Sequence, residues 1–303
     1  MGLRRVHGAV AAMALTGLLA GCGADAGGGR AEDTGPEPAI GPVMAEPLDG
    51  AKVALPLDGY SVSAEESAAI FRARGQATRT CMKAKGFDYQ PGEPPVPPPL
   101  TPIDHDHLGL LSGAAARQTG YHRLPRPDAR SGTSADGAGE RSDAYELALN
   151  GPRSGRAGLA TPGTDRGCTG EIEQWFQAEG VGRTSGDLIG ELRAKAYDRT
   201  AADSRVKAAL AAWRSCMEGL GHHYSGPAQA SSQAWPDPVS DRERATAVAD
   251  MDCKARVGLI GTWYTVQTAY QQQLIGRNEA ALNTVKEVSA QRVAAARKLL
   301  GGG

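Results

Sequence analysis

The sequence predicts a mainly α-helical protein with two related halves, each clamped by a disulfide, a long C-terminal helix and an insertion rich in proline and glycine. Two observations lead to this fold class. Apolar and alanine side chains recur every three or four residues in several stretches, which is the period of an amphipathic helix. The phrase CMKAKGFDY at 81–89 also returns as CMEGLGHHY at 216–224, with cysteine, glycine and tyrosine at the same spacing.

The first 21 residues have the features of a secretory signal peptide. Arg4 and Arg5 precede an apolar run over 9–19, and the residues LAGC follow and end at Cys22. The run is shorter than the roughly 20 residues that a membrane-spanning helix needs. LAGC resembles the lipobox of bacterial lipoproteins, in which the cysteine thiol receives a diacylglyceryl group. We therefore expect lipidation of Cys22 and a place on the outer face of the cell membrane; a secreted protein with a chance cysteine is the alternative.

Residues 22–62 are expected to form a flexible tether. Small, acidic and proline side chains dominate this stretch, and they bury too little apolar area to offset the entropy of ordering the chain. The rest of the chain is long enough for one or two hydrophobic cores. The formal net charge of −1 is not typical of a protein that binds nucleic acid, which usually carries a basic surface.

Residues 63–180 are expected to form the first helical half and residues 181–303 the second. The sequences SAEE at 63–66 and SDRE at 240–243 both have the spacing of a capping box, which marks a helix start. Gly86 and Gly221 suit the left-handed position that closes a helix.

The first half also carries the insertion, at about 90–166. It opens with the proline-rich PGEPPVPPPLTP, and tracts rich in glycine and serine follow. Between these tracts, SDAYELALNG is typical of a short capped helix. We expect this insertion to be a surface excursion.

Residues 241–300 have the apolar pattern of a long helix that packs on a neighbour. Gly276 and Asn278 mark a hinge that would divide this helix into two arms. A coiled-coil homodimer through the same helix is an alternative that the pattern leaves open.

Four cysteines remain when Cys22 is set aside, and an even number outside the cytoplasm favours disulfides. The simplest pairing, one bridge within each half, joins Cys81 to Cys168 and Cys216 to Cys253. Reactive or metal-binding cysteines are the alternative, but the chain has no CxxC motif and no cysteine and histidine pair at zinc spacing.

Candidate chemistry is sparse. His105 and His107 alternate with two aspartates and are weak candidates for a metal site. Ser204 begins an SxxK motif, but the partner motifs of penicillin-interacting enzymes are missing, so a helix cap is the better interpretation. Among the tryptophans, Trp235 is expected to be an exposed contact and Trp213 and Trp263 to be core. We expect neither a cofactor nor a catalytic residue.

Three phrases in the second half, W-x-x-CM-x-x-x-G-x-x-Y, A-D-x-x-C and G-T-W-Y-x-x-x-x-A-Y-x-x-x-L-I, resemble a family of lipoproteins from actinobacteria such as streptomycetes. The match is strongest over about 204–300. The resemblance implies a lipid-anchored, extracytoplasmic protein of this architecture, and it supplies no catalytic residues.

These observations favour a non-catalytic binding or scaffolding role in the cell envelope, with the membrane as one partner through the lipid and an envelope protein as another. The alternatives are a hydrolase that acts on cell-wall or extracellular substrate and a carrier that holds a small ligand in a cleft between the halves.

Overall fold

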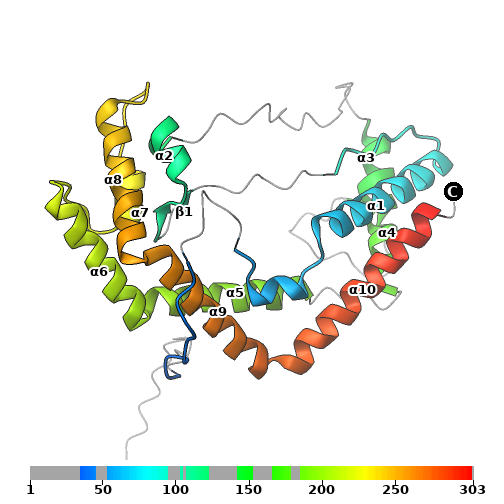
Figure 1. The fold of residues 1–303 in the computed structure, drawn as a ribbon. Helices are drawn as coiled ribbons and strands as arrows, with labels where there is room; N and C mark the ends of the chain where they lie inside the picture. Colours follow the sequence, from blue (N-terminus) through cyan, green and yellow to red (C-terminus); the bar gives the residue numbers. More distant parts are fainter. Residues whose placement is uncertain are drawn as a thin grey trace, which may run out of the picture. The chain divides into compact units, whose positions relative to one another are not determined.

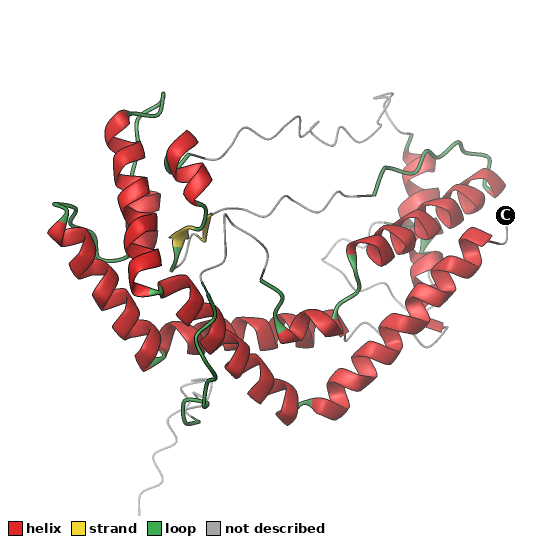
Figure 2. Ribbon diagram, viewed as in Figure 1, coloured by secondary structure: helices red, strands yellow, loops and turns green. Residues whose placement is uncertain are grey.

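The structure of the protein is a computed structural model, and it describes residues 35–45, 53–94, 103–104, 107–122, 142–152, 166–178 and 185–301. The chain divides into two units, residues 1–36 and residues 37–303, and all the elements described below belong to the second. The described part is mainly helical, as predicted, and contains two disulfides (Figures 1 and 2).

Within the described residues, the elements follow one another as a short 3-10 helix, one helix, a two-stranded antiparallel ribbon and nine more helices. In chain order they are η1 (Pro56–Tyr60), α1 (Ala64–Ala84), β1 (Ile103–Asp104), β2 (Gly109–Leu110), α2 (Gly113–Thr119), α3 (Asp143–Asn150), α4 (Gly167–Ala178), α5 (Ser185–Ala202), α6 (Ser204–Gly219), α7 (Pro227–Ser232), α8 (Asp241–Val257), α9 (Leu259–Arg277) and α10 (Glu279–Gly301). In the ribbon, Ile103 pairs with Leu110 and Asp104 with Gly109.

The start of α1 has the predicted capping box. The backbone N–H of Glu66 donates to the Ser63 hydroxyl at 3.1 Å, and the backbone N–H of Ser63 donates to the Glu66 carboxylate at 2.9 Å. These two bonds satisfy amides that the first turn of a helix would otherwise leave without acceptors.

The two cysteine phrases end their helices in the same way. Gly86 and Gly221 have positive φ values of 83° and 80°, which only glycine adopts without strain. In each phrase, the methionine after the cysteine is fully buried, and its carbonyl accepts a backbone N–H from five residues further on, at 2.9 Å. The donor and acceptor pairs are Phe87 with Met82 and His222 with Met217.

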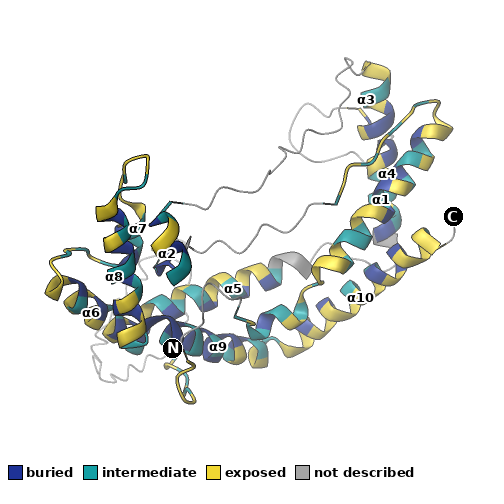
Figure 3. Cartoon of the chain, turned by 45° about the horizontal axis from the view of Figure 1, so that its top comes forward, coloured by how far each residue is buried: buried dark blue, intermediate teal, exposed yellow. Residues whose placement is uncertain are grey.

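The C-terminal stretch does not form one long helix with a single hinge. Asn278 separates α9 from α10, close to the predicted hinge, but a second break lies at Gly258, between α8 and α9. Gly258 has φ 66° and ψ 33°, a left-handed conformation that turns the chain before the next helix starts. In α10, buried residues follow one side and exposed residues the other (Figure 3).

Parts of the predicted tether pack against the helices, so residues 22–62 are not a free coil over their whole length. The backbone N–H of Met44 donates to the Thr265 hydroxyl at 3.0 Å. In η1, Leu57 is fully buried and its N–H donates to the Gln271 side chain at 2.9 Å. Leu57 is one of the few large apolar residues of this stretch, and its burial gives the segment a reason to be ordered.

The insertion at about 90–166 is predicted to be a surface excursion, but parts of it contribute to the core. Leu108 and Leu110, before and within β2, are fully buried. Helix α2 packs against α8, and α3 packs against α4. Helix α3 has the predicted bounds, with Ser142 as its N-cap and Gly151 as its C-cap.

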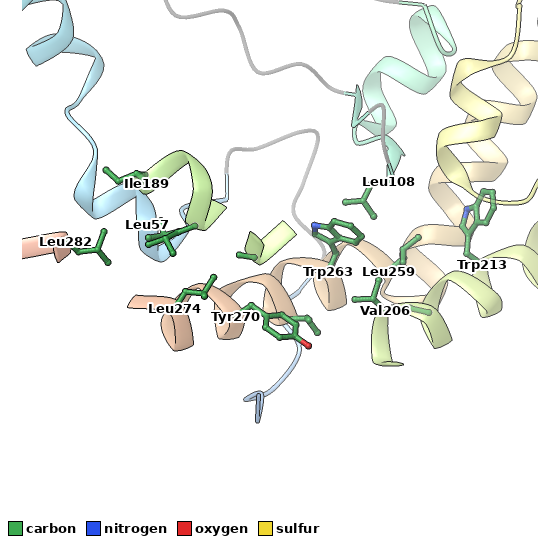
Figure 4. Close-up of a cluster of buried hydrophobic side chains, with 14 of the residues drawn as sticks. Leu57, Leu108, Ile189, Val206, Trp213, Leu259, Trp263, Tyr270, Leu274 and Leu282 are labelled. Carbon is green, nitrogen blue, oxygen red and sulfur yellow. The ribbon is translucent and has the colours of Figure 1, made fainter. Parts of the chain in front are cut away.

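The largest hydrophobic cluster joins η1 and the segment before β2 to helices α5, α6, α8, α9 and α10 (Figure 4). Trp213 and Trp263 are almost fully buried in it, as predicted. Smaller clusters lie between α2, α7 and α8, between α1, α4 and α10, and between α1, α3 and α4.

Several helix pairs join residues that are far apart in the chain. Helix α1 packs on α10, α5 packs on α9, and α6 packs on both α8 and α9. The division into halves at residue 180 remains a prediction, and the α1–α10 and α2–α8 pairs connect the two stretches.

Candidate functional site

Two of the sequence-predicted site residues, Cys22 and His105, lie outside the described residues. His107 is described, and its ring packs against those of Tyr197 and Trp263 at centroid distances of 5.2 and 5.3 Å. Within the described ranges, no group of three or more histidine, cysteine, aspartate or glutamate side chains is placed to hold a metal ion, and no helix is long and apolar enough to span a bilayer.

The other four cysteines form the two bridges expected from the sequence, Cys81–Cys168 and Cys216–Cys253. Their Cα–Cα distances are 5.7 and 5.8 Å, which are ordinary for a disulfide. In each bridge the second cysteine is fully buried. The bridges tie α1 to α4 and α6 to α8, so these cysteines hold helices together.

Ser204 is not the cap of α6 that the sequence predicts. The N-cap is Asp203, whose carboxylate accepts the backbone N–H of Arg205 at 2.9 Å. The Ser204 hydroxyl donates to the Glu37 carboxylate at 2.7 Å. The same carboxylate accepts the backbone N–H of Ser204 at 2.6 Å. The serine of the SxxK motif therefore fastens residue 37 to the start of α6.

Burial of Asp203 opposes its ionisation, but hydrogen bonds from the side chain and backbone of Arg205 and from the Tyr270 hydroxyl outweigh this effect and lower its pKa. The hydroxyl of Tyr270 donates to Asp203 at 3.1 Å. Its own burial and this bond to Asp203 raise the pKa of Tyr270 to about 12.

A buried ion pair lies on the inner face of α8, and the sequence alone does not predict it. Lys254 and Asp250 are both fully buried, with Nζ and Oδ2 2.8 Å apart. Lys254 also donates to the Leu110 carbonyl at 2.7 Å. Asp250 accepts from the Trp213 indole N–H at 2.9 Å and from the Tyr121 hydroxyl at 3.3 Å.

Burial raises the pKa of Asp250, and the charge of Lys254 together with the hydrogen bonds from Lys254, Trp213 and Tyr121 opposes this shift. Apart from the bond between the two residues, the hydrogen bonds given above join the pair to the Trp213 indole, the Tyr121 hydroxyl and the Leu110 carbonyl. The pair therefore connects α8 with α6, α2 and β2, and we interpret it as a structural element.

Glu243 is the third buried charge on α8. Its carboxylate oxygen Oε1 accepts the backbone N–H of Tyr121 at 2.9 Å and lies 2.8 Å from Nδ1 of His122. Gly120 makes room for this contact, because a Cβ atom there would lie 2.6 Å from the same oxygen. Glu243, the fourth residue of the capping box predicted at 240–243, therefore binds the end of α2 rather than the start of its own helix.

Trp235 is not the exposed contact that the sequence predicts. Its ring stacks on that of Tyr121, with the centroids 5.5 Å apart and the planes at 19°. Its indole N–H donates to the Ala230 carbonyl at 2.9 Å. The residue is half-buried in the cluster between α2, α7 and α8.

A cavity of about 480 Å³ lies between the segment from η1 to α1 on one side and α5 and α10 on the other. This volume is within the range of about 300–1,000 Å³ that is usual for small-molecule sites. Three of its lining residues are arginines, and we call it the arginine cavity: Arg74, Arg193 and Arg292. None of the described residues that line it is acidic.

The other lining residues are of two kinds. Three serines, Ser61, Ser67 and Ser289, offer hydroxyl groups. Four apolar side chains, which we call the apolar wall, complete most of the lining: Val62, Ile70, Phe71 and Ile189. Phe71 is one of the few large apolar residues whose side chain is also exposed. The arrangement combines cations, hydroxyl donors and apolar surface in one cavity.

Carboxylates behind the arginines neutralise the cavity only in part. Glu173 lies 2.8 Å from Nη2 of Arg74 and 3.8 Å from Nη2 of Arg292. Arg193 donates to Asp58 at 2.8 Å and to the Ser61 hydroxyl at 3.0 Å. Among the described residues, three guanidinium groups thus share two contacting carboxylates.

Arg74 and Arg292 each keep one buried Nε–H that has no hydrogen-bond partner within the described part of the chain. Burial and the nearby charge of Arg74 lower the pKa of Arg292, while Glu173 opposes this shift.

The sequence gives no local signal for this cavity, because its arginines come from three helices that are distant in the chain. Comparisons with protein-family models, with curated proteins and with solved structures find no match to this chain.

Proposed function

We propose that this protein is a lipid-anchored, extracytoplasmic binding protein that holds a small ligand in the arginine cavity without transforming it. The observation that carries the binding role is the cavity itself, because it combines a volume suited to a small molecule with both polar donors and apolar walls. Its lining residues come from both sides of residue 180 in the chain, which supports the proposal that a ligand lies between the two predicted halves.

The non-catalytic part of the proposal rests on what the described polar groups do. The most deeply buried charges, Glu243, Asp250 and Lys254, are bonded to other parts of the fold. The serine of the SxxK motif is bonded to Glu37. Neither the three buried charges nor this serine forms a pair of nucleophile and base beside the arginine cavity, and covalent hydrolysis would need such a pair.

The anchor and the location are proposed from the sequence alone. LAGC at 19–22 supports lipidation of Cys22, and the likeness to actinobacterial lipoproteins supports the same location. The amino-terminal stretch would then connect the membrane to residue 37, where the Glu37 carboxylate binds the start of α6.

We also propose that the two halves arose from one repeated unit. The support is the matching end of α1 and α6, where a cysteine, a buried methionine and a left-handed glycine hold equivalent places. In both, the cysteine then bridges to a later helix.

The test of the binding role is to purify the full chain from its own membrane and to identify small molecules that leave it on denaturation, by mass spectrometry. The variant Ser289→Phe should lose the ligand, because the aromatic ring fills the cavity. Ala290→Phe is the matched control, since residue 290 is the exposed neighbour on α10. A chain that carries no small molecule, or one that Ser289→Phe retains unchanged, would contradict the role.

The anchor is tested separately by cell fractionation. Wild-type protein should remain with the membrane, and Cys22→Ala should be released into the medium. Equal retention of both would rule out a lipid at this position.

A further inference from the structure

We propose that the ligand of the arginine cavity is an amphipathic oxyanion, a molecule with a carboxylate or phosphate head and a short apolar part. This inference rests on the proposed binding role and adds the chemical class of the ligand. The head would contact Arg74, Arg193 and Arg292, and the apolar part would lie against the apolar wall.

The charge of the cavity indicates an anion. Three arginines line it and no described lining residue is acidic, while Glu173 and Asp58 contact the guanidinium groups from outside the lining. A net positive charge in a partly enclosed site attracts an anion more strongly than it would in open water.

The donor geometry indicates an oxyanion with at least two acceptor oxygens. A guanidinium group presents a fork of N–H donors that matches carboxylate and phosphate. In this cavity the fork of Arg292 is incompletely used, because its Nη2 atom approaches the Glu173 carboxylate only at 3.8 Å. Serine hydroxyls on both sides, Ser61 and Ser289, could donate to the same head group.

Glu173 shows how such a head group can be held. Its two oxygens face two different arginines, Oε2 toward Arg74 and Oε1 toward Arg292. A ligand oxyanion on the cavity side would stand between the same two guanidinium groups and reduce the repulsion between them. Binding would therefore reduce the unfavourable interaction between Arg74 and Arg292.

The apolar wall indicates that the head is attached to an apolar part. An inorganic ion would leave Val62, Ile70, Phe71 and Ile189 in contact with water, whereas a short alkyl or aryl group would cover them. Burial of apolar surface adds affinity roughly in proportion to the area covered. A ligand with both parts should therefore bind more tightly than either part alone.

Four probes separate these contributions: hexyl phosphate, hexanoate, inorganic phosphate and hexanol. Each is titrated calorimetrically into the full chain carrying Cys22→Ala at low ionic strength. We expect hexyl phosphate or hexanoate to bind at least tenfold more tightly than both inorganic phosphate and hexanol. Which of the two binds more tightly identifies the head group.

The variant Arg292→Met should weaken binding of the better probe by about tenfold or more, since it removes a charged donor. Arg297→Met is the matched control, because Arg297 lies on the same helix, is 69% exposed and is not a lining residue. Thermal unfolding checks that both variants fold, and Arg292→Lys, which keeps the charge and loses the fork, serves if Arg292→Met does not.

Binding of hexanol as tight as that of hexyl phosphate and hexanoate, equal binding by Arg292→Met and wild type, or no binding of any probe would overturn the inference. The proposed function would fall if the purified protein carried no small molecule, or if Ser289→Phe retained that molecule unchanged. A neutral molecule recovered from the purified protein and lost in Ser289→Phe would keep the binding role and reject the oxyanion.

Discussion

At the scale of single residues, the spacing S-x-x-E occurs twice at helix starts in this chain, and the two glutamates bind different partners. Ser63 with Glu66 and Ser240 with Glu243 both read S-x-x-E, and both serines accept the expected backbone N–H. Glu66 bonds back to the amide of its own N-cap, whereas the carboxylate of Glu243 binds the end of α2. The difference comes from burial, since Glu243 lies beneath another helix that offers a backbone N–H.

Glu243→Ala should therefore destabilise the protein far more than Glu66→Ala. Loss of the Glu243 carboxylate leaves the buried N–H of Tyr121 without an acceptor, and we expect the free energy of unfolding to fall by about 2–4 kcal/mol. Glu66→Ala removes a bond that water can replace. Urea-induced unfolding measures both, and equal losses would show that Glu243 acts only as a local cap.

The Asp250–Lys254 pair should show strong coupling. Asp250→Asn or Lys254→Met alone leaves a buried group without its partner, so each should lower the free energy of unfolding by about 3–5 kcal/mol. The double variant should lose less than the sum, by about 1–3 kcal/mol. Strictly additive losses in a double-mutant cycle would mean that the two groups do not depend on each other.

At the scale of elements, the sequence predicts helix ends better than helix continuity. The start of α1, both ends of α3 and the glycine endings after α1 and α6 follow from local side-chain chemistry, and all are as expected. The break at Gly258 does not follow from the sequence, because the apolar pattern continues through this residue. Its left-handed conformation is what separates α8 from α9.

Gly221→Ala should lower the free energy of unfolding by about 1 kcal/mol, because alanine is strained at a φ of 80° although open space surrounds the position. Gly219→Ala is a control two residues away, because Gly219 is the last residue of α6 and also has open space around it, and this change should be neutral or stabilising. Gly86→Ala should match Gly221→Ala within a few tenths of a kcal/mol. A harmless Gly221→Ala would show that this helix end does not depend on glycine.

At the scale of the whole molecule, contacts between distant segments could not be predicted from periodicity. The arginine cavity needs residues from α1, α5 and α10, and no local pattern records that these helices meet. Likewise, the sequence around Asp250 and Lys254 is typical of charges on the exposed side of a helix. Only the fold brings Tyr121 and Leu110 into contact with them. The disulfide pairing was easier to predict, because the repeated phrase restricted the choices.

Each disulfide should contribute strongly to stability. Its two cysteines are 87 residues apart in Cys81–Cys168 and 37 apart in Cys216–Cys253. For such loops the chain-entropy relation gives upper values of about 4–5 and about 4 kcal/mol. Replacing both cysteines of a bridge by serine should lower the free energy of unfolding by up to these amounts, as measured by denaturant unfolding. Unchanged midpoints in both double variants would contradict this role.

The order of the two bridges along the chain bears on how the protein is made. They do not interleave, so both cysteines of the first bridge are synthesised before either cysteine of the second. Helix α1, however, packs on α10, which is synthesised after all the other described helices. Oxidation of the first pair can thus precede the arrival of a principal neighbour of α1. A chain that stopped before residue 279 would be covalently closed yet would expose the face of α1 that α10 covers.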